Sequence, residues 1–212
     1  MPLTRFERFL PWTGLIAGLC WIGQASLGAV GADDTPGGAS AGVGRDNLVA
    51  NTVGNAFVVI MAVALLFFGA AVRERIRSGE ASTSPSSAVA FGAWITVSAA
   101  LAQMAFWNKI LLTAAEDDDA AVVTAFGYGE YFSWLAVGIG VSAAFIATGL
   151  GGLRNAVLPK WFAVTTIVLG ALALLGACSV PPGGLVTYFL LPIWLIAAAI
   201  IIARRQKKAA LA

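Results

Sequence analysis

Long runs of apolar residues recur along the chain, and short polar segments separate them. Each run is about 20 residues or longer, which is the length that an α-helix needs to cross ~30 Å of hydrocarbon. The pattern predicts six membrane-spanning segments, with approximate bounds 10–31, 48–72, 88–115, 120–150, 161–180 and 186–203.

We expect each run to be helical, because the bilayer has no water for backbone groups that lack an internal hydrogen bond. The alternating apolar and polar residues of a membrane β-barrel strand do not occur in the sequence. The predicted fold is therefore all-α: one transmembrane domain over 1–212, built as a six-transmembrane-helix bundle.

The composition supports a membrane protein. The 212 residues are 59% hydrophobic and only 11% charged, and the mean hydropathy is +0.85. A soluble domain carries roughly 25% charged residues, so this chain has too few charges to coat a water-soluble globule. We expect membrane lipids around it and no nucleic-acid partner, because the basic residues flank apolar segments.

The first apolar run needs a separate decision. Arg5 and Arg8 precede it, and it ends in small residues that resemble a signal-peptide cleavage region. Its apolar stretch of about 20 residues is longer than an ordinary signal-peptide core. We therefore expect it to be retained as the first span.

The charges are sorted by sign along the chain. The two tails and the loops after the second and fourth spans hold eleven of the thirteen basic residues. The remaining loops carry most of the acids, including the run Glu116 to Asp119. By the positive-inside rule, both termini are predicted to be cytoplasmic, in a bacterial cytoplasmic (plasma) membrane. The basic tail Arg204 to Lys208 suits anionic headgroups.

The sequence offers little familiar redox or metal chemistry. It has no histidine, which is the usual axial haem ligand and the commonest metal ligand and general base. Its two cysteines, Cys20 and Cys178, lie far apart in apolar segments without metal-type spacing. We predict no metal site, no cofactor and no catalytic residues, and expect both cysteines to be packing residues.

Two charged residues, Lys109 and Glu130, fall inside apolar segments. From a rise of 1.5 Å per residue, Lys109 is about 9 Å below the outer end of the third span and Glu130 about 15 Å into the fourth. A charge at such a depth is costly unless it is paired, by about 2.5–3.5 kcal/mol. Because a short turn joins the two spans, we predict that Lys109 and Glu130 form an ion pair.

Other polar and aromatic residues are predicted at similar depth in the outer half of the bundle. Asn47, Asn51 and Asn55 recur every four residues and form one stripe of a helix. The candidate ligand-binding residues are Lys109, Glu130, Asn51, Asn55, Gln24, Gln103, Asn108, Tyr128, Tyr131, Trp107 and Trp134. Helical phase turns Lys109 well away from Gln103, so these residues cannot all face one cavity.

The same residues have two interpretations. They can line an outward-facing cavity that binds a small molecule or an ion. Alternatively, Lys109 extends to the outer headgroups, and the amides and hydroxyls join helices by hydrogen bonds around Glu130. Both interpretations remain open on the sequence alone.

Small residues and prolines mark expected helix contacts. Gly14 and Gly18, and Gly138 and Ser142, have the spacing that lets membrane helices approach closely. Pro192 is expected to kink the last span.

Leu158-Pro159-Lys160-Trp161 opens the fifth span, Leu191-Pro192-Ile193-Trp194 lies in the last one, and the helices are rich in Ala, Gly and Val. In these features the chain resembles uncharacterised six-span integral membrane proteins of high-GC actinobacteria, a family of unknown function. The resemblance covers most of the chain in style and implies a plasma-membrane location. It implies no activity, and it assigns no functional residue.

The leading expectation is a non-enzymatic membrane protein that binds or translocates a small molecule or ion at an outward-facing polar site. One alternative is a structural or accessory subunit of a membrane complex, acting as a homo-oligomer or with a membrane partner. The other is a lipid-modifying membrane enzyme, for which Glu130 is the candidate acid or base.

Overall fold

The computed structural model describes residues 4–28, 48–79, 85–116, 120–178, 180 and 186–209, and every regular element in them is helical. The elements are α1 (Arg5–Phe9), α2 (Trp12–Gly28), α4 (Leu48–Arg77), α5 (Ser86–Glu116), α6 (Ala120–Arg154), α7 (Lys160–Ala177), the π-helix η1 (Val186–Leu190) and α9 (Leu191–Ala209). The prediction of an all-α fold is confirmed for this part of the chain.

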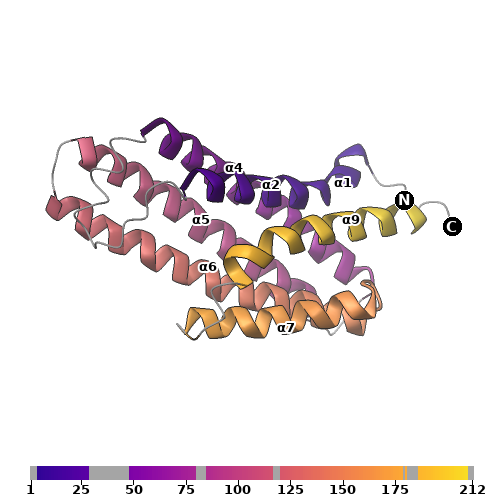
Figure 1. Cartoon of the computed structure of the whole chain (residues 1–212). Helices are drawn as coiled ribbons and strands as arrows, with labels where there is room; N and C mark the ends of the chain where they lie inside the picture. Colours follow the sequence, from indigo (N-terminus) through magenta and orange to yellow (C-terminus); the bar gives the residue numbers. More distant parts are fainter. Residues whose placement is uncertain are drawn as a thin grey trace.

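The long helices lie side by side in one bundle (Figure 1). Helices α4, α5, α6 and α7 pack against one another in chain order, α2 packs on α4, and α9 returns to pack on α2. We call the end where α4, α6 and α9 finish the basic end, and the opposite end, where α5 finishes at Glu116, the acidic end. Figure 1 shows the acidic end of α5 and α6 reaching beyond α7.

Five of the described helices contain a segment long and apolar enough to cross a membrane. Their bounds are Val49–Arg77, Ser86–Ile110, Phe132–Arg154, Lys160–Ala177 and Tyr188–Lys207. Helix α2, with 17 residues, is not among them. The described helices are therefore compatible with an integral membrane protein, and five of them are of spanning length.

The basic segments that were predicted to lie outside the spans are helical. Helix α4 continues through Arg73 to Arg77, α6 reaches Arg154, and α9 reaches Ala209. Arginine and lysine are good helix formers, and their charge is favourable at the carboxyl end of a helix. For that reason, the end of an apolar run did not predict the residue at which the helix ends.

An aromatic cluster joins five helices at the centre of the bundle. The indole of Trp194 on α9 packs on one ring from each of α4, α5, α6 and α7, and its ring centroid lies 6.1 Å from Phe68, 5.7 Å from Trp94, 4.3 Å from Phe145 and 5.8 Å from Phe162. We call these five residues the aromatic centre; all are buried. Trp194 Nε1 donates to Thr166 Oγ1 at 2.8 Å, which fixes the orientation of the indole as well as its position.

Glycines let α2 lie close to its two neighbours. A Cβ atom on Gly14 would come within 2.5 Å of the Phe68 ring, and one on Gly18 within 2.9 Å of the Pro192 carbonyl oxygen. The predicted Gly-x-x-x-Gly motif is therefore a packing surface on which α4 and α9 converge. Gly138 is less tightly packed, since its added Cβ would only touch Ala177 at 3.6 Å.

The last helix starts with the π-helix η1, followed at once by Pro192 as the second residue of α9. Proline has no backbone N–H, so it cannot donate to the carbonyl four residues earlier, which is that of Tyr188. Trp21 Nε1 on α2 donates to this carbonyl oxygen at 2.9 Å. A side chain from the first long helix thus bonds to the backbone at the start of the last one.

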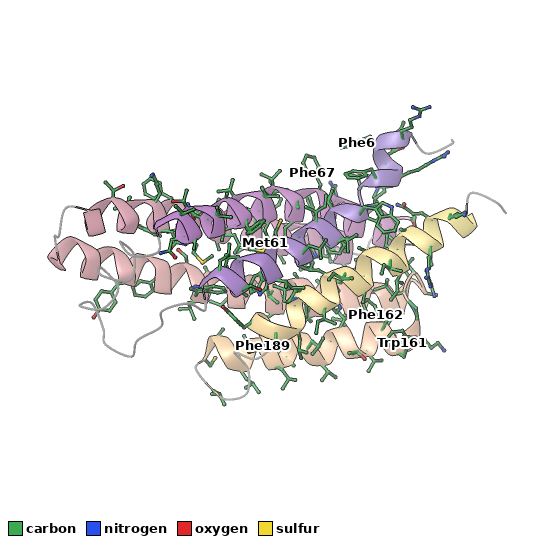
Figure 2. The ribbon with its side chains drawn as sticks, turned by 45° about the horizontal axis from the view of Figure 1, so that its top comes forward. Phe6, Met61, Phe67, Trp161, Phe162 and Phe189 are labelled. Carbon is green, nitrogen blue, oxygen red and sulfur yellow. The ribbon has the colours of Figure 1, made fainter. Side chains whose placement is uncertain are left out.

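The short helix α1 precedes the bundle. Thr4 and Glu7 form a capping box at its amino end. The ring of Phe6 meets that of Phe67 on α4, with centroids 6.0 Å apart (Figure 2). This contact attaches α1 to the basic end of the bundle.

Candidate functional site

The candidate residues lie in the part of the bundle nearest the acidic end, and helix contacts show which of them share a level. A Cβ on Gly129 of α6 would meet the Trp107 indole of α5, and one on Gly23 of α2 would meet the Phe57 ring of α4. Ser98 Oγ of α5 donates to the Ala62 carbonyl of α4. These three contacts set the register of α2, α4, α5 and α6.

Counting outward from these contacts places Asn55 beside the Trp107–Gly129 level. On α4, Asn55 lies seven residues, about 10 Å, from Ala62 in the direction of the acidic end. A step of the same length from Ser98 toward that end of α5 leads to Ala105. Trp107 is two residues further along α5. The backbone of Glu130, next to Gly129, therefore lies within about 3 Å in height of Asn55.

Asn51 and Asn55 are both half-buried at the outer end of the interior stripe of α4. That stripe continues through Val58, Ala62 and Leu65, which are all buried. The side-chain oxygen Oδ1 of Asn55 is buried and accepts no hydrogen bond from any residue that the structure describes. A buried carbonyl without a donor is costly, by about 1–3 kcal/mol, so this atom marks a place where a donor belongs. Gln24 on α2 is also half-buried, one residue beyond the Gly23–Phe57 contact.

Trp134 lies one turn from this level and belongs to a second aromatic group. Its ring centroid is 5.6 Å from that of Trp21 and 5.9 Å from that of Tyr188, and the Trp21 and Tyr188 rings are 6.2 Å apart. At such spacings the three rings pack on one another. Because the three rings contact one another, they do not surround a ligand.

Three candidates lie on the outside of the bundle. Gln103, Lys109 and Tyr128 are exposed. Lys109 follows Trp107 by two residues, which is about 200° of helical rotation, so it points away from the side of α5 that packs on α6. Exposed Phe106, one turn before Lys109, shares its outer face. The structure thus separates Lys109 from Asn55 and Trp107.

Asn108 is half-buried. The side chains of Glu130 and Tyr131 lie outside the described residues, and so do residues 117–119 of the acidic turn. Glu130 precedes Trp134 by four residues of α6, one helical turn. The ion pair between Lys109 and Glu130 stays a prediction.

The chemistry on the described residues is sparse. No group of three histidine, cysteine or acidic side chains that could hold a metal ion occurs in the described ranges. Cys20 is buried and Cys178 is exposed, and both are free thiols. Cys178 therefore departs from the expectation of a buried packing residue, because it caps the carboxyl end of α7.

Sequence reasoning missed two groups in this region. The bond from Trp21 to the Tyr188 carbonyl joins residues 167 positions apart. The pairing of Trp194 with Thr166 likewise links different helices. The proline at 192 was the one local signal, because it leaves a carbonyl without its usual donor.

Comparison with known proteins adds no relative. No protein-family model, curated protein or solved structure matches the chain. The class that the structure supports is thus defined by its own helices: a helical bundle compatible with an integral membrane protein.

Proposed function

We propose that the protein is a six-span protein of the bacterial cytoplasmic membrane that binds a small cationic ligand near the acidic end of its bundle. Helix α2 is the sixth span in this proposal. Its 17 residues measure about 26 Å, within the range that spans a bilayer. It also packs on two helices of spanning length, α4 and α9.

The distribution of basic residues supports an orientation with both termini in the cytoplasm. Basic side chains occur at the ends of α4, α6 and α9 and at the start of α7, all at the basic end. A reporter that is active only in the periplasm, fused after Ala209, should stay inactive. The same reporter inserted between α5 and α6 should be active, and the reverse pattern would overturn the orientation.

The observation that carries the binding proposal is the buried, unpartnered Oδ1 of Asn55. An acceptor in this position calls for a ligand with a hydrogen-bond donor. Glu130 stands at the same level on α6, and Gln24 adds another amide from α2. The proposal includes the Glu130 carboxylate with these amide oxygens, and such a set of groups favours a ligand that is positively charged, such as an ammonium or an alkali cation. Lys109, on the outer face of α5, does not belong to this set.

The first test measures the stability of the protein without a ligand. If Asn55 Oδ1 is kept without a partner for a ligand, then Asn55→Leu should raise the free energy of unfolding by about 1 kcal/mol. If Asn55 only joins helices by hydrogen bonds, the same change should lower it. Gln103→Leu, at an exposed position on α5, is the matched control and should have little effect.

The second test measures binding. Thermal unfolding of the purified chain in detergent is followed with ammonium, methylammonium, sodium and potassium chlorides at equal ionic strength, with choline chloride as the bulky reference. One of the small cations should raise the melting temperature of the wild type, and Asn55→Leu and Glu130→Gln should abolish the rise. Lys109→Gln should preserve it. If none of the small cations raises the melting temperature of the wild type, the binding proposal is overturned and the accessory-subunit alternative remains.

A further inference from the structure

We propose that Arg75 of α4 and Arg205 of α9 form a binding site for the phosphate group of an anionic phospholipid at the basic end of the bundle. The site is at the opposite end from the cation site and does not depend on it. Both residues are half-buried, both have N–H donors to spare, and both lie close to the end of a long apolar run.

Burial distinguishes these two residues from the other cations. Among the basic residues whose burial the structure describes, Arg75 and Arg205 are half-buried, and the rest are exposed. One turn brings the two arginines together: Arg205 donates to the Ala156 carbonyl, and the neighbouring Asn155 donates to the carbonyl of Ile76, the residue after Arg75. Holding two like charges together away from water is unfavourable unless an opposite charge compensates them.

No described acid supplies that charge. Over the described ranges, no salt bridge reaches Arg75 or Arg205, and the Nε atom of Arg75 is buried without a hydrogen-bond partner. Arg205 Nη1 donates to the Ala156 carbonyl at 3.1 Å, which uses one of its five N–H donors. Donors remain on both guanidinium groups for a further acceptor.

The surrounding backbone fixes the two arginines in place. Asn155 Nδ2 donates to the Ile76 carbonyl at 3.1 Å, which attaches the end of α4 to the turn between α6 and α7. Ala156 in that turn has a φ of 52°, and its carbonyl accepts the bond from Arg205. Three segments of the chain therefore meet at the arginine pair, and the pair does not depend on a single flexible tail.

The ligand chemistry follows from the donors and from the depth. Guanidinium groups bind phosphate oxygens through paired, charge-assisted hydrogen bonds. Arg75 follows Val72, and Arg205 follows Ala203, so each arginine lies two or three residues, about 3–5 Å, beyond the long apolar run of a helix of spanning length. That is the level of the phospholipid headgroups, where basic pockets between helices bind anionic lipids.

Neighbouring cations do not offer an equivalent site. The Arg73 guanidinium lies 5.3 Å from the centroid of the Phe91 ring and is engaged with α5. Arg77, on the last turn of α4, is exposed. Arg77 is therefore a matched control for Arg75, because it has the same charge, helix and end of the bundle.

The test measures lipid binding to the full chain in a neutral detergent by native mass spectrometry, with phosphatidylglycerol and phosphatidylcholine as probes. We expect one molecule of phosphatidylglycerol to bind more tightly than phosphatidylcholine. Arg75→Gln and Arg205→Gln should each weaken it about tenfold, and Arg77→Gln should weaken it by less than about twofold. Circular dichroism and gel filtration establish that each variant is folded.

Three results would overturn the inference. Equal affinity for the two lipids in the wild type would show that there is no anion site. An equal loss in Arg77→Gln would show general attraction to the basic end. Displacement of phosphatidylglycerol by millimolar inorganic phosphate would show that the site takes soluble phosphate rather than lipid. If Arg75→Gln fails to fold, then phosphatidylglycerol binding to Arg205→Gln and Arg205→Lys is the test. Both variants should bind the lipid more weakly than the wild type, because lysine does not have the bidentate guanidinium group.

Discussion

The indole Nε1 of Trp21 donates to the backbone carbonyl of Tyr188 at 2.9 Å. That carbonyl lies four residues before Pro192, which has no N–H to give to it. The start of α9 is therefore bonded to a donor from α2, a helix at the other end of the sequence. The bond also holds the π-helix η1 against the aromatic group of Trp21, Trp134 and Tyr188.

Removing the indole donor should destabilise the bundle in a way that depends on Pro192. Trp21→Phe keeps an aromatic ring but removes the donor to the Tyr188 carbonyl, so the free energy of unfolding should fall by about 1–3 kcal/mol. In a Pro192→Ala background the new backbone N–H can reach that carbonyl, so the same change should cost less. Reversible unfolding in mixed micelles measures all four proteins of this cycle.

Trp12→Phe is the control for that cycle, because Trp12 lies at the start of α2 and is exposed. Equal costs of Trp21→Phe with and without Pro192 would mean that the bond does not compensate for the proline.

The aromatic centre should be the most sensitive part of the interior. Trp194→Ala removes an indole that contacts rings of four other helices, and we expect a loss of about 3–5 kcal/mol. Trp161→Ala removes the same side chain at a position that is 66% exposed, and the loss should be below about 1 kcal/mol. Comparable melting temperatures for the two variants would remove Trp194 from this role.

Glycine-to-alanine changes should have opposite effects at two positions. Gly18→Ala places a Cβ 2.9 Å from a backbone oxygen of α9, which cannot move aside without shifting the helix, so the bundle should be destabilised. Gly54→Ala meets no atom within 4 Å, and it should stabilise α4 by up to about 1 kcal/mol because alanine is the better helix former. Thermal unfolding in one detergent compares the two, and a rise in stability for Gly18→Ala would contradict the close packing.

The capping box of α1 should respond to pH. The backbone N–H and the hydroxyl of Thr4 both donate to the Glu7 carboxylate, which lowers the pKa of Glu7 below its ordinary value. Since the folded pKa is the lower one, the box stabilises α1 at pH values above the unfolded pKa. Its contribution is lost as the pH falls through the folded pKa. Side-chain NMR of Glu7 follows this titration.

Thr4→Ala removes the hydroxyl and serves as the comparison for that titration. The pKa of Glu7 should move back up toward the ordinary value in this variant. An unchanged titration would show that the hydroxyl bond contributes nothing.

The sequence predicted an all-helical chain and five of the six proposed spans, but not the contacts between helices. Runs such as 88–115 and 120–150 came within a few residues of α5 and α6, because a membrane helix is signalled by local hydropathy. The basic ends were missed, because charge marks the membrane boundary and not the end of a helix. Nothing local indicated that Trp194 would reach Thr166, since that contact depends on how α7 and α9 pack.

The candidate site shows the same limit. The asparagine spacing predicted one face of α4, because helical spacing fixes which residues share a face. Asn51 and Asn55 are both half-buried on that helix, and Asn47 lies outside the described residues. The depth along the helices grouped Lys109 with Asn55. In the structure Lys109 is exposed on α5, whereas Asn55 is half-buried on α4. Depth gives the height of a residue along the bundle, whereas its direction depends on which neighbour each helix face contacts.

The position of Trp194 also has a consequence for how the protein is made. Helix α9 leaves the ribosome after α4, α5, α6 and α7, yet it carries the ring on which their four aromatic side chains close. Until it is inserted, Phe68, Trp94, Phe145 and Phe162 have no common partner. A chain interrupted before residue 191 would therefore lack the one ring that contacts aromatic side chains of all four helices.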